Sequence, residues 1–134
     1  MDAMMNGSVA GSRERGFTLI EVMVAVAILA IISAVAIPIY RDYVQTSRVG
    51  ALVNNIATIE TFEEDFRLRN GAYQDGAWNG STGDAGLTAL GWQPETPDGT
   101  TYAITVAGST YTVTAVDSSG TTVCRVYPAR SDCP

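Results

Sequence analysis

The chain has 134 residues, a length that suffices for one small domain but not for two. Its net charge is −6 and its pI is near 4.4. All eight positive charges are scattered arginines. Phosphate binding needs clustered Lys and Arg, so nucleic acid is not expected as the main partner. Histidine is absent, which excludes Ser-His-Asp catalysis, Cys-His catalysis and any histidine metal ligand within this chain.

The N-terminal region joins a polar segment to a long apolar one. Residues 1–16 are small and polar, and they end in Arg-Glu-Arg-Gly. Residues 17–21 read Phe-Thr-Leu-Ile-Glu, and residues 22–40 carry no charge. At about 1.5 Å per residue, a helix over residues 17–40 can cross a hydrocarbon core of roughly 30 Å. Arginines flank the apolar run on both sides, so their number does not set its orientation.

An ordinary secretory signal fits this region poorly, because such a signal has a short apolar run followed by a small-residue cleavage site. The loose match at Ala34-Val35-Ala36 would leave Ile37-Pro38 as a new start. A cut after Gly16 would instead keep the apolar helix on the mature protein. A plain membrane anchor explains everything except Glu21.

Glu21 needs a reason, because a charge placed centrally in a membrane costs about 2.5–3.5 kcal/mol. A charge near the membrane surface can simply reach water. If the chain is cut after Gly16, Phe17 gains a free amine close to Glu21, and the two groups are natural partners within one chain or between neighbours. Pairing between neighbours would fix the displacement of one helix along another, so Glu21 is interpreted as a register device.

These residues carry a family resemblance. Residues 15–21, Arg-Gly-Phe-Thr-Leu-Ile-Glu, and the retained apolar helix after them resemble the class III leader of type IV pilins and pseudopilins. The Ala-Ile-Pro-Ile-Tyr run at residues 36–40 is also similar to that family. The resemblance is strong over about 30 residues, and over the rest of the chain it lies only in architecture.

The resemblance implies several roles. A prepilin peptidase would remove residues 1–16 by cutting between Gly16 and Phe17, and the new Phe17 amine would be N-methylated. Glu21 would contact the N-terminus of a neighbouring subunit. Many relatives carry a glycine within the apolar helix, but residues 17–41 contain none. Local unwinding of the helix in a filament is therefore expected at Pro38, whose ring removes a backbone hydrogen bond.

The helical pattern continues into the globular part, which is expected over residues 41–134. Apolar residues recur at three- and four-residue steps: Val49, Leu52, Val53, Ile56, Ile59, Phe62 and Phe66. One helix from Phe17 to Arg69, about 80 Å long, is predicted to end at Asn70-Gly71. The pairs expected on its polar face are Glu63–Arg67 and Asp65–Arg69. The acidic group Glu60, Glu63, Glu64 and Asp65 is interpreted as a solvated face and not as a metal site.

Residues 70–99 are predicted to form a long connection that packs down on the core through Tyr73, Trp78 and Trp92. Asp75, Asp84 and Asp98 invite a calcium hypothesis, but their spacing matches no EF-hand, and no metal or cofactor is expected. Asn79-Gly80-Ser81 fits a glycosylation sequon, a short pattern that often occurs by accident.

The last part of the chain, residues 100–134, reads as strands. Residues 101–106, 110–116 and 121–127 are β-branched and aromatic with alternation, and turns are expected at residues 107–109 and 117–120. An α+β fold is predicted, in which the long helix packs on a small antiparallel sheet of three to four strands.

The two cysteines, Cys124 and Cys133, lie near the C-terminus without CxxC spacing. They are either two free thiols or one disulfide that ties down the tail. Export to an oxidising compartment favours the disulfide, and a C-terminal disulfide loop is also similar to type IV pilins.

The resemblance thus implies a type IV pilus subunit, major or minor, that is not an enzyme. Its expected partners are other pilins, the prepilin peptidase and an inner-membrane assembly platform. It would reside in the inner membrane before assembly and in an extracellular pilus afterwards. A type II secretion pseudopilin is one alternative. Another is a membrane-tethered binding module that uses Trp78 and Trp92.

Overall fold

The computed structural model describes residues 16–95 and 97–134 of the chain. The chain divides into two compact units after Ile39, and the second unit, Tyr40–Pro134, contains the sheet. Of the predicted leader, only Gly16 lies within the described residues. Helix α1 (Leu19–Asn70) begins in the first unit and ends in the second.

The bounds of α1 agree closely with the predicted helix. It has 52 residues and ends at the expected stop signal. Gly71 takes φ 84°, a left-handed conformation that glycine adopts at no steric cost, and its N–H donates to the Arg67 carbonyl at 2.7 Å. This hydrogen bond closes the last turn and confirms the stop predicted at Asn70-Gly71.

Five antiparallel strands form one sheet, and their order in the sheet follows the chain. They are β1 (Gly76–Trp78), β2 (Thr101–Ala107), β3 (Thr110–Val116), β4 (Thr122–Tyr127) and β5 (Ser131–Asp132). The three long strands are those predicted from alternation. The two short edge strands were not predicted, so the α+β class is confirmed with a sheet of five strands instead of three to four.

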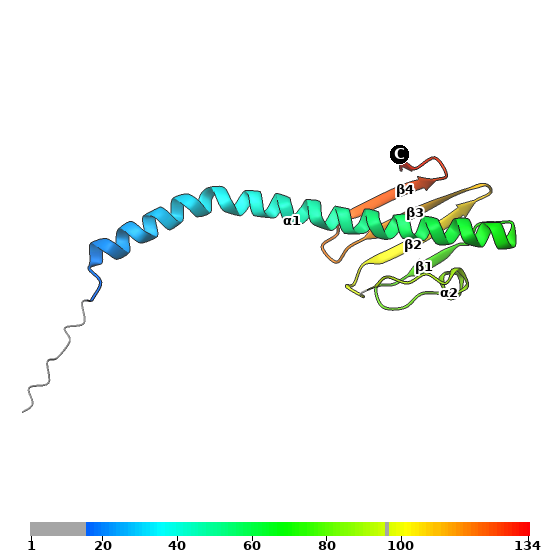
Figure 1. Cartoon of the computed structure of the whole chain (residues 1–134), viewed down its shortest axis with the longest axis horizontal. Helices are drawn as coiled ribbons and strands as arrows, with labels where there is room; N and C mark the ends of the chain where they lie inside the picture. Colours follow the sequence, from blue (N-terminus) through cyan, green and yellow to red (C-terminus); the bar gives the residue numbers. More distant parts are fainter. Residues whose placement is uncertain (1–15, 96) are drawn as a thin grey trace, which may run out of the picture. The chain divides into compact units, whose positions relative to one another are not determined.

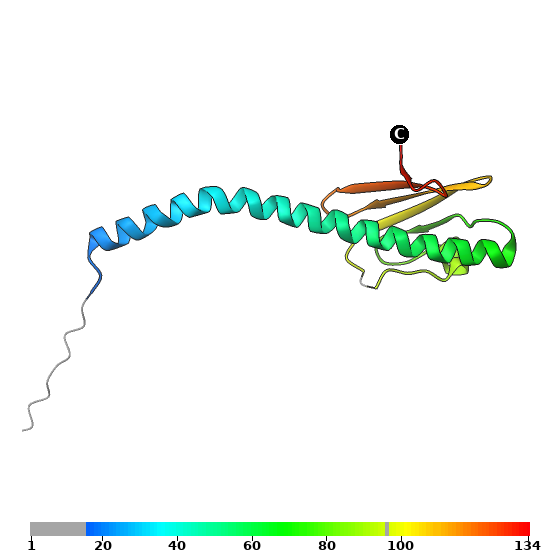
Figure 2. The same ribbon diagram turned by 45° about the horizontal axis from the view of Figure 1, so that its top comes forward.

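The C-terminal part of α1 lies along one face of the sheet, as Figure 1 and Figure 2 show. Leu52, Ile56 and Ile59 form the buried stripe of this helix. They join inward residues of the strands, such as Ile104 and Val113, which are paired across β2 and β3. The core predicted for the head is therefore the space between this stripe and the sheet.

The connection over residues 70–99 contains more structure than expected. Besides β1 it holds a short helix, α2 (Ala85–Leu90), whose N-cap Asp84 accepts a hydrogen bond from the Leu87 N–H at 2.8 Å. Trp78 and Trp92 are 9% and 5% exposed, so the prediction that the aromatics pack on the core is confirmed.

The aspartates of this region each hold a backbone N–H group. Asp84 caps α2, Asp75 accepts from the Val106 N–H at 2.5 Å, and Asp98 accepts from the Thr100 N–H at 2.9 Å. These bonds give each of the three aspartates a local structural role, as an acceptor for a backbone N–H in a helix cap, a turn or a strand.

The polar face of α1 differs from the prediction at Glu63. This side chain is 0% exposed and lies in the core, so it is not part of a solvated face. Arg67 pairs with Glu64 at 2.7 Å, and the predicted Glu63–Arg67 pair is wrong because the Glu63 side chain is buried in the core. The Asp65–Arg69 pair is present.

Candidate functional site

The start of α1 is organised by Thr18 and Glu21. Residues 16–18 are not helical, and Thr18 stands directly before the first helical residue, Leu19. The Thr18 N–H and hydroxyl both donate to Glu21 Oε2 at 2.7 Å, and the Glu21 N–H donates to Thr18 Oγ1 at 3.3 Å. This is a reciprocal capping box, which satisfies backbone donors that the first turn leaves open.

The capping box gives Glu21 a structural role at the start of α1. A carboxylate in the first turn also interacts favourably with the helix dipole. Both bonds that Glu21 accepts end on Oε2, and Oε1 accepts none from the described residues. The Thr-x-x-Glu pattern was readable in the sequence, but the sequence interpretation singled out Glu21 alone and missed Thr18.

The predicted cleavage point lies on this non-helical segment. Phe17 is 90% exposed. A Cβ built on Gly16 meets nothing within 4 Å, so the described chain itself leaves room for a side chain there. Any need for glycine at position 16 would therefore come from something that binds this segment.

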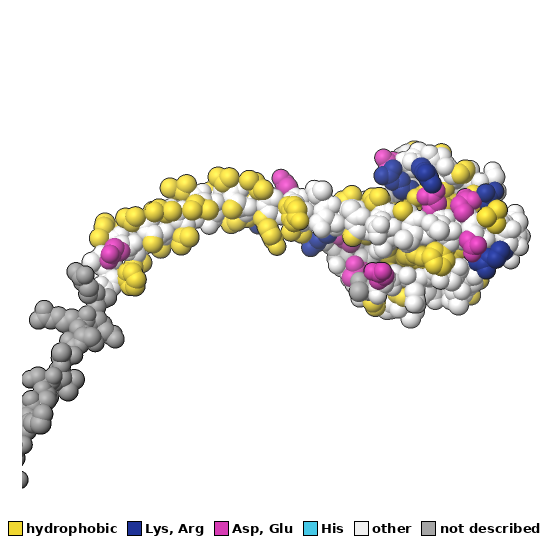
Figure 3. Space-filling view, viewed as in Figure 1, with side chains coloured by type: hydrophobic (Ala, Val, Ile, Leu, Met, Phe, Trp, Pro, Cys, Tyr) yellow, Lys and Arg dark blue, Asp and Glu magenta, His cyan; other side chains and the backbone are white. Residues whose placement is uncertain are grey.

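The apolar half of α1 presents its side chains outward all round. Figure 3 shows hydrophobic side chains along this stretch of α1 on the face drawn, and residues 19–40 are all exposed. This stretch is strongly apolar, and none of it is buried against the described residues. By length and composition this segment can cross a membrane. Pro38 lies inside the segment, and the helix continues through it.

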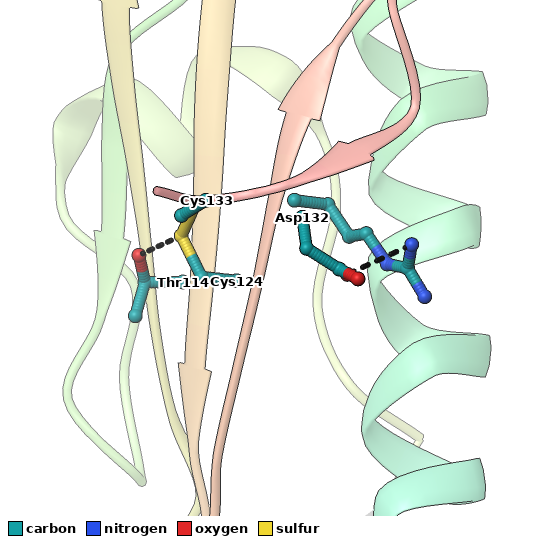
Figure 4. The surroundings of a disulfide bond; sticks show 5 residues. Thr114, Cys124, Asp132 and Cys133 are labelled. Carbon is teal, nitrogen blue, oxygen red and sulfur yellow. Dashed lines mark hydrogen bonds and ion pairs between the residues drawn. A yellow bond between two sulfur atoms is a disulfide. The ribbon is translucent and has the colours of Figure 1, made fainter.

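The C-terminal tail is fastened to the sheet. Cys124 on β4 and Cys133 after β5 form a disulfide with a Cα–Cα distance of 5.5 Å, so the predicted bond is confirmed. Figure 4 shows Thr114 beside it, with its hydroxyl 3.3 Å from the Cys124 sulfur. Arg125 and Asp132 pair at 2.9 Å across the same two strands.

The two tryptophans proposed for a binding module belong to the core. Trp92 packs edge-on against Tyr102 at 5.0 Å between ring centres, and its indole N–H donates to Thr58 Oγ1 at 2.8 Å. Within the described residues, no group of three or more metal-ligating side chains comes together.

Two family models match the chain. One, described as the prokaryotic N-terminal methylation motif, matches residues 11–37. The other, described as type IV minor pilin ComP, DNA uptake sequence receptor, matches residues 38–127.

The chain belongs to the type IV pilin family.

Curated relatives agree with this assignment. The pilin is 32% identical over 121 residues to the type IV major fimbrial protein FimA of Dichelobacter nodosus, covering 90% of this chain and 67% of that protein. It is 35% identical over 79 residues to fimbrial protein Q of Moraxella bovis, covering 58% and 50%. It is 37% identical over 70 residues to prepilin peptidase-dependent protein D of Escherichia coli K12, covering 51% and 48%.

These matches cover the relatives unevenly. The pilin spans half of the length of the Moraxella protein and 33% of a Pseudomonas aeruginosa fimbrial protein with which it shares 43% of 51 residues. No solved structure matches the chain.

Proposed function

We propose that this pilin is a structural subunit of a type IV pilus, held in the inner membrane before assembly and polymerised through its N-terminal helix. One observation carries the proposal: the apolar half of α1 is exposed along its whole length and begins with the Thr18–Glu21 capping box. The relatives described as fimbrial proteins support it.

The physical reason is burial. Covering one large apolar side chain contributes about 1.5–3 kcal/mol, and more than a dozen on this segment are exposed. Lipid covers them before assembly, and a helix that leaves lipid needs another apolar environment. A bundle of identical helices supplies one, and repeated head-to-tail contacts extend it into an open filament.

The division of the chain follows from this proposal. Residues 1–16 are the leader, cut by a prepilin peptidase between Gly16 and Phe17, after which the Phe17 amine is methylated. Residues 17–40 form the membrane and filament-core helix, and residues 41–134 form the head. Tyr40 and Tyr43 are 69% and 71% exposed and lie on either side of Arg41. Tyrosine is an amphipathic residue that is enriched at membrane–water interfaces.

Glu21 sets the helical step in this proposal. Its Oε2 atom belongs to the capping box, so Oε1 is the atom offered to the Phe17 amine of a neighbour. Unwinding during assembly is assigned to Pro38, where the ring already removes one backbone hydrogen bond.

Filament isolation from the native host tests the function. Surface material sheared from cells should contain the pilin as a chain that begins at N-methylated Phe17, and intact-mass spectrometry checks both changes. A chain confined to membranes with its leader intact would contradict the proposal.

A type II secretion pseudopilin remains the alternative within the family. The terminal disulfide and the fimbrial relatives favour the pilus. Deleting the gene should remove surface filaments and leave secretion of exoproteins unchanged, whereas a pseudopilin would give the opposite result.

DNA binding by the head is a second candidate, favoured by the match to a family described as a DNA uptake sequence receptor. The charges of the head oppose tight binding, because four of its arginines are paired with carboxylates: Arg67, Arg69, Arg125 and Arg130. Fluorescence anisotropy with a short labelled duplex at low salt tests it. Binding that falls on changing Arg48 to Ala would support this candidate, and no binding would reject it.

A further inference from the structure

Two adjoining hollows lie on the head beside the loop that follows α2. They measure about 280 and 310 Å³, and Gly91, Trp92 and Gln93 line both. The first lies between this loop and α1, and the second lies between the same loop, Trp78 and α2. Together they form a groove, here called the 91–93 groove, and the pilus proposal assigns no role to it.

The wall supplied by α1 combines polar and aromatic side chains. Asn54, Thr58 and Phe62 follow one another at four-residue steps and so share one face of the helix. Phe62 is 39% exposed, one of the few large apolar side chains of the head that is open to solvent. The ring therefore offers apolar surface at the edge of the groove.

Hydrogen-bonding side chains line the same hollow as Phe62. Asn54 on α1, with Gln93 and Glu95 on the loop, lines the first hollow, and no side-chain hydrogen bond ties these three to other described residues. A carboxamide offers two donors and one acceptor, and a carboxylate offers acceptors only. The groove thus presents both kinds of hydrogen-bonding group beside an aromatic ring.

The second hollow adds aromatic surface to the groove. Trp78 lines it, while the indole Nε1–H of this residue is buried out of reach of solvent. The contribution of Trp78 to a ligand is therefore its ring surface and not a hydrogen bond.

The lining also restricts the ligand. Among the described residues, no arginine lines either hollow and Glu95 is the one charged residue, so phosphates, carboxylates and nucleic acid are disfavoured. The volume suits one or two small rings. Neutral sugars match these features, because they combine an apolar ring face with many hydroxyl groups.

We propose that the head of this pilin binds a neutral saccharide in the 91–93 groove. The sugar ring lies against Phe62, and Asn54 and Gln93 bond its hydroxyls. Trp92 is a positioning residue, because its bond to Thr58 holds the loop wall against α1. This binding is independent of leader removal and filament assembly.

Saturation-transfer NMR tests the proposal on the full chain in lauryldimethylamine oxide, a detergent without a sugar headgroup. The probes are N-acetylglucosamine, chitobiose, galactose and maltose, with glucuronic acid as a charged comparison. At least one neutral sugar should receive saturation on its ring protons, and glucuronic acid should receive less.

Three variants locate the binding. Gln93→Ala, on the exposed loop, and Phe62→Ala should each weaken binding about ten-fold or more, while Thr105→Ala, on the opposite sheet face, should leave it unchanged. Tryptophan fluorescence checks that each variant is folded. No transfer to any probe, or transfer that survives both groove variants, would overturn the proposal.

Discussion

At the scale of single residues, Glu21 carries two roles that substitution can separate. Glu21→Gln keeps the acceptor that caps Thr18, because Gln also completes a capping box, but it removes the charge. Thr18→Ala removes the cap and keeps the charge. If the charge sets the filament step, Glu21→Gln should reduce sheared filaments at least ten-fold, and Thr18→Ala should reduce them much less.

The same strains provide the control. Leader removal and membrane insertion should survive in both variants, since neither changes Gly16 or the apolar run, and immunoblots of membrane fractions check this. A strong assembly defect in Thr18→Ala with normal filaments from Glu21→Gln would assign the function of Glu21 to helix capping instead.

Glu63 is the second residue whose environment decides its chemistry. Burial raises its pKa from 4.5 to about 7, with the carboxylates of Asp75 and Glu64 adding to the shift and the Gln74 N–H opposing it. The nearby cations are committed elsewhere, Arg67 to Glu64 and Arg130 to Glu60. Glu63 is therefore neutral in weakly acidic solution, and its Oε2 accepts a hydrogen bond from the Gln74 backbone N–H at 3.0 Å.

This raised pKa predicts a pH dependence of stability. The folded head binds the Glu63 proton more tightly than the unfolded chain does, so its contribution is complete below pH 4.5 and is lost as the pH rises to about 7. The loss is on the order of 3 kcal/mol. Urea unfolding followed by tryptophan fluorescence measures it, since both tryptophans lie in the core of the head.

Glu63→Gln is the matched variant, because the amide keeps an acceptor for Gln74 and cannot ionise. The difference in unfolding free energy between the two proteins should change across pH 4.5–7 and stay constant above it. A constant difference across the whole range would show that Glu63 is ionised throughout.

The sequence contained a signal for the burial of Glu63, but the charge of this residue favoured the opposite prediction. Positions 52, 56, 59, 63 and 66 continue one stripe at three- and four-residue steps, and position 63 lies on it. The charge of Glu63 and the i,i+4 spacing to Arg67 favoured an exposed ion pair, and only the packed structure shows that the stripe prevails.

At the scale of elements, the helices and strands that were predicted correctly are those with a long apolar periodicity in the sequence. The long helix and strands β2, β3 and β4 have many residues in phase, so their bounds were close. Strands β1 and β5 have 3 and 2 residues, and α2 has 6. Such short elements depend on tertiary contacts, which local pattern does not contain.

The docking of α2 requires glycine at close backbone contacts, and the tightest of these contacts is at Gly86. A Cβ on Gly86 would overlap the Asp75 carbonyl oxygen, which belongs to the backbone and cannot rotate away. Gly86→Ala should therefore destabilise the head by about 1–3 kcal/mol. Urea unfolding monitored by tryptophan fluorescence measures the change.

Gly50 is the matched control within α1, because a Cβ there meets no described atom within 4 Å. Gly50→Ala should stabilise the same transition by about 0.5–1 kcal/mol, since alanine loses less backbone entropy in a helix. Equal effects of the two substitutions would mean that α2 does not pack against Asp75 in solution.

At the scale of the whole molecule, exposed apolar side chains of this pilin occur in two different surroundings. Ile31 in the apolar run is 71% exposed, and Leu68 near the end of α1 is 80% exposed. The surroundings differ, because Ile31 lies among continuous apolar side chains while Leu68 lies between two arginines that are paired with carboxylates. The pilus proposal requires a cover for the first residue and none for the second.

The substitutions Ile31→Asp and Leu68→Asp test that difference directly. A charge near the middle of the span costs about 2.5–3.5 kcal/mol in lipid. The other apolar side chains hold the pilin in membranes, so Ile31→Asp should lower its amount there only slightly. It should abolish filaments, because a core of apolar helices offers the carboxylate no partner. Leu68→Asp places its charge in water and should change neither. Carbonate-washed membranes and sheared surface fractions, blotted side by side, give the readout. Normal filaments from Ile31→Asp would mean that the apolar run lies outside the filament core, because no bundle of such helices accommodates an unpaired carboxylate at every subunit.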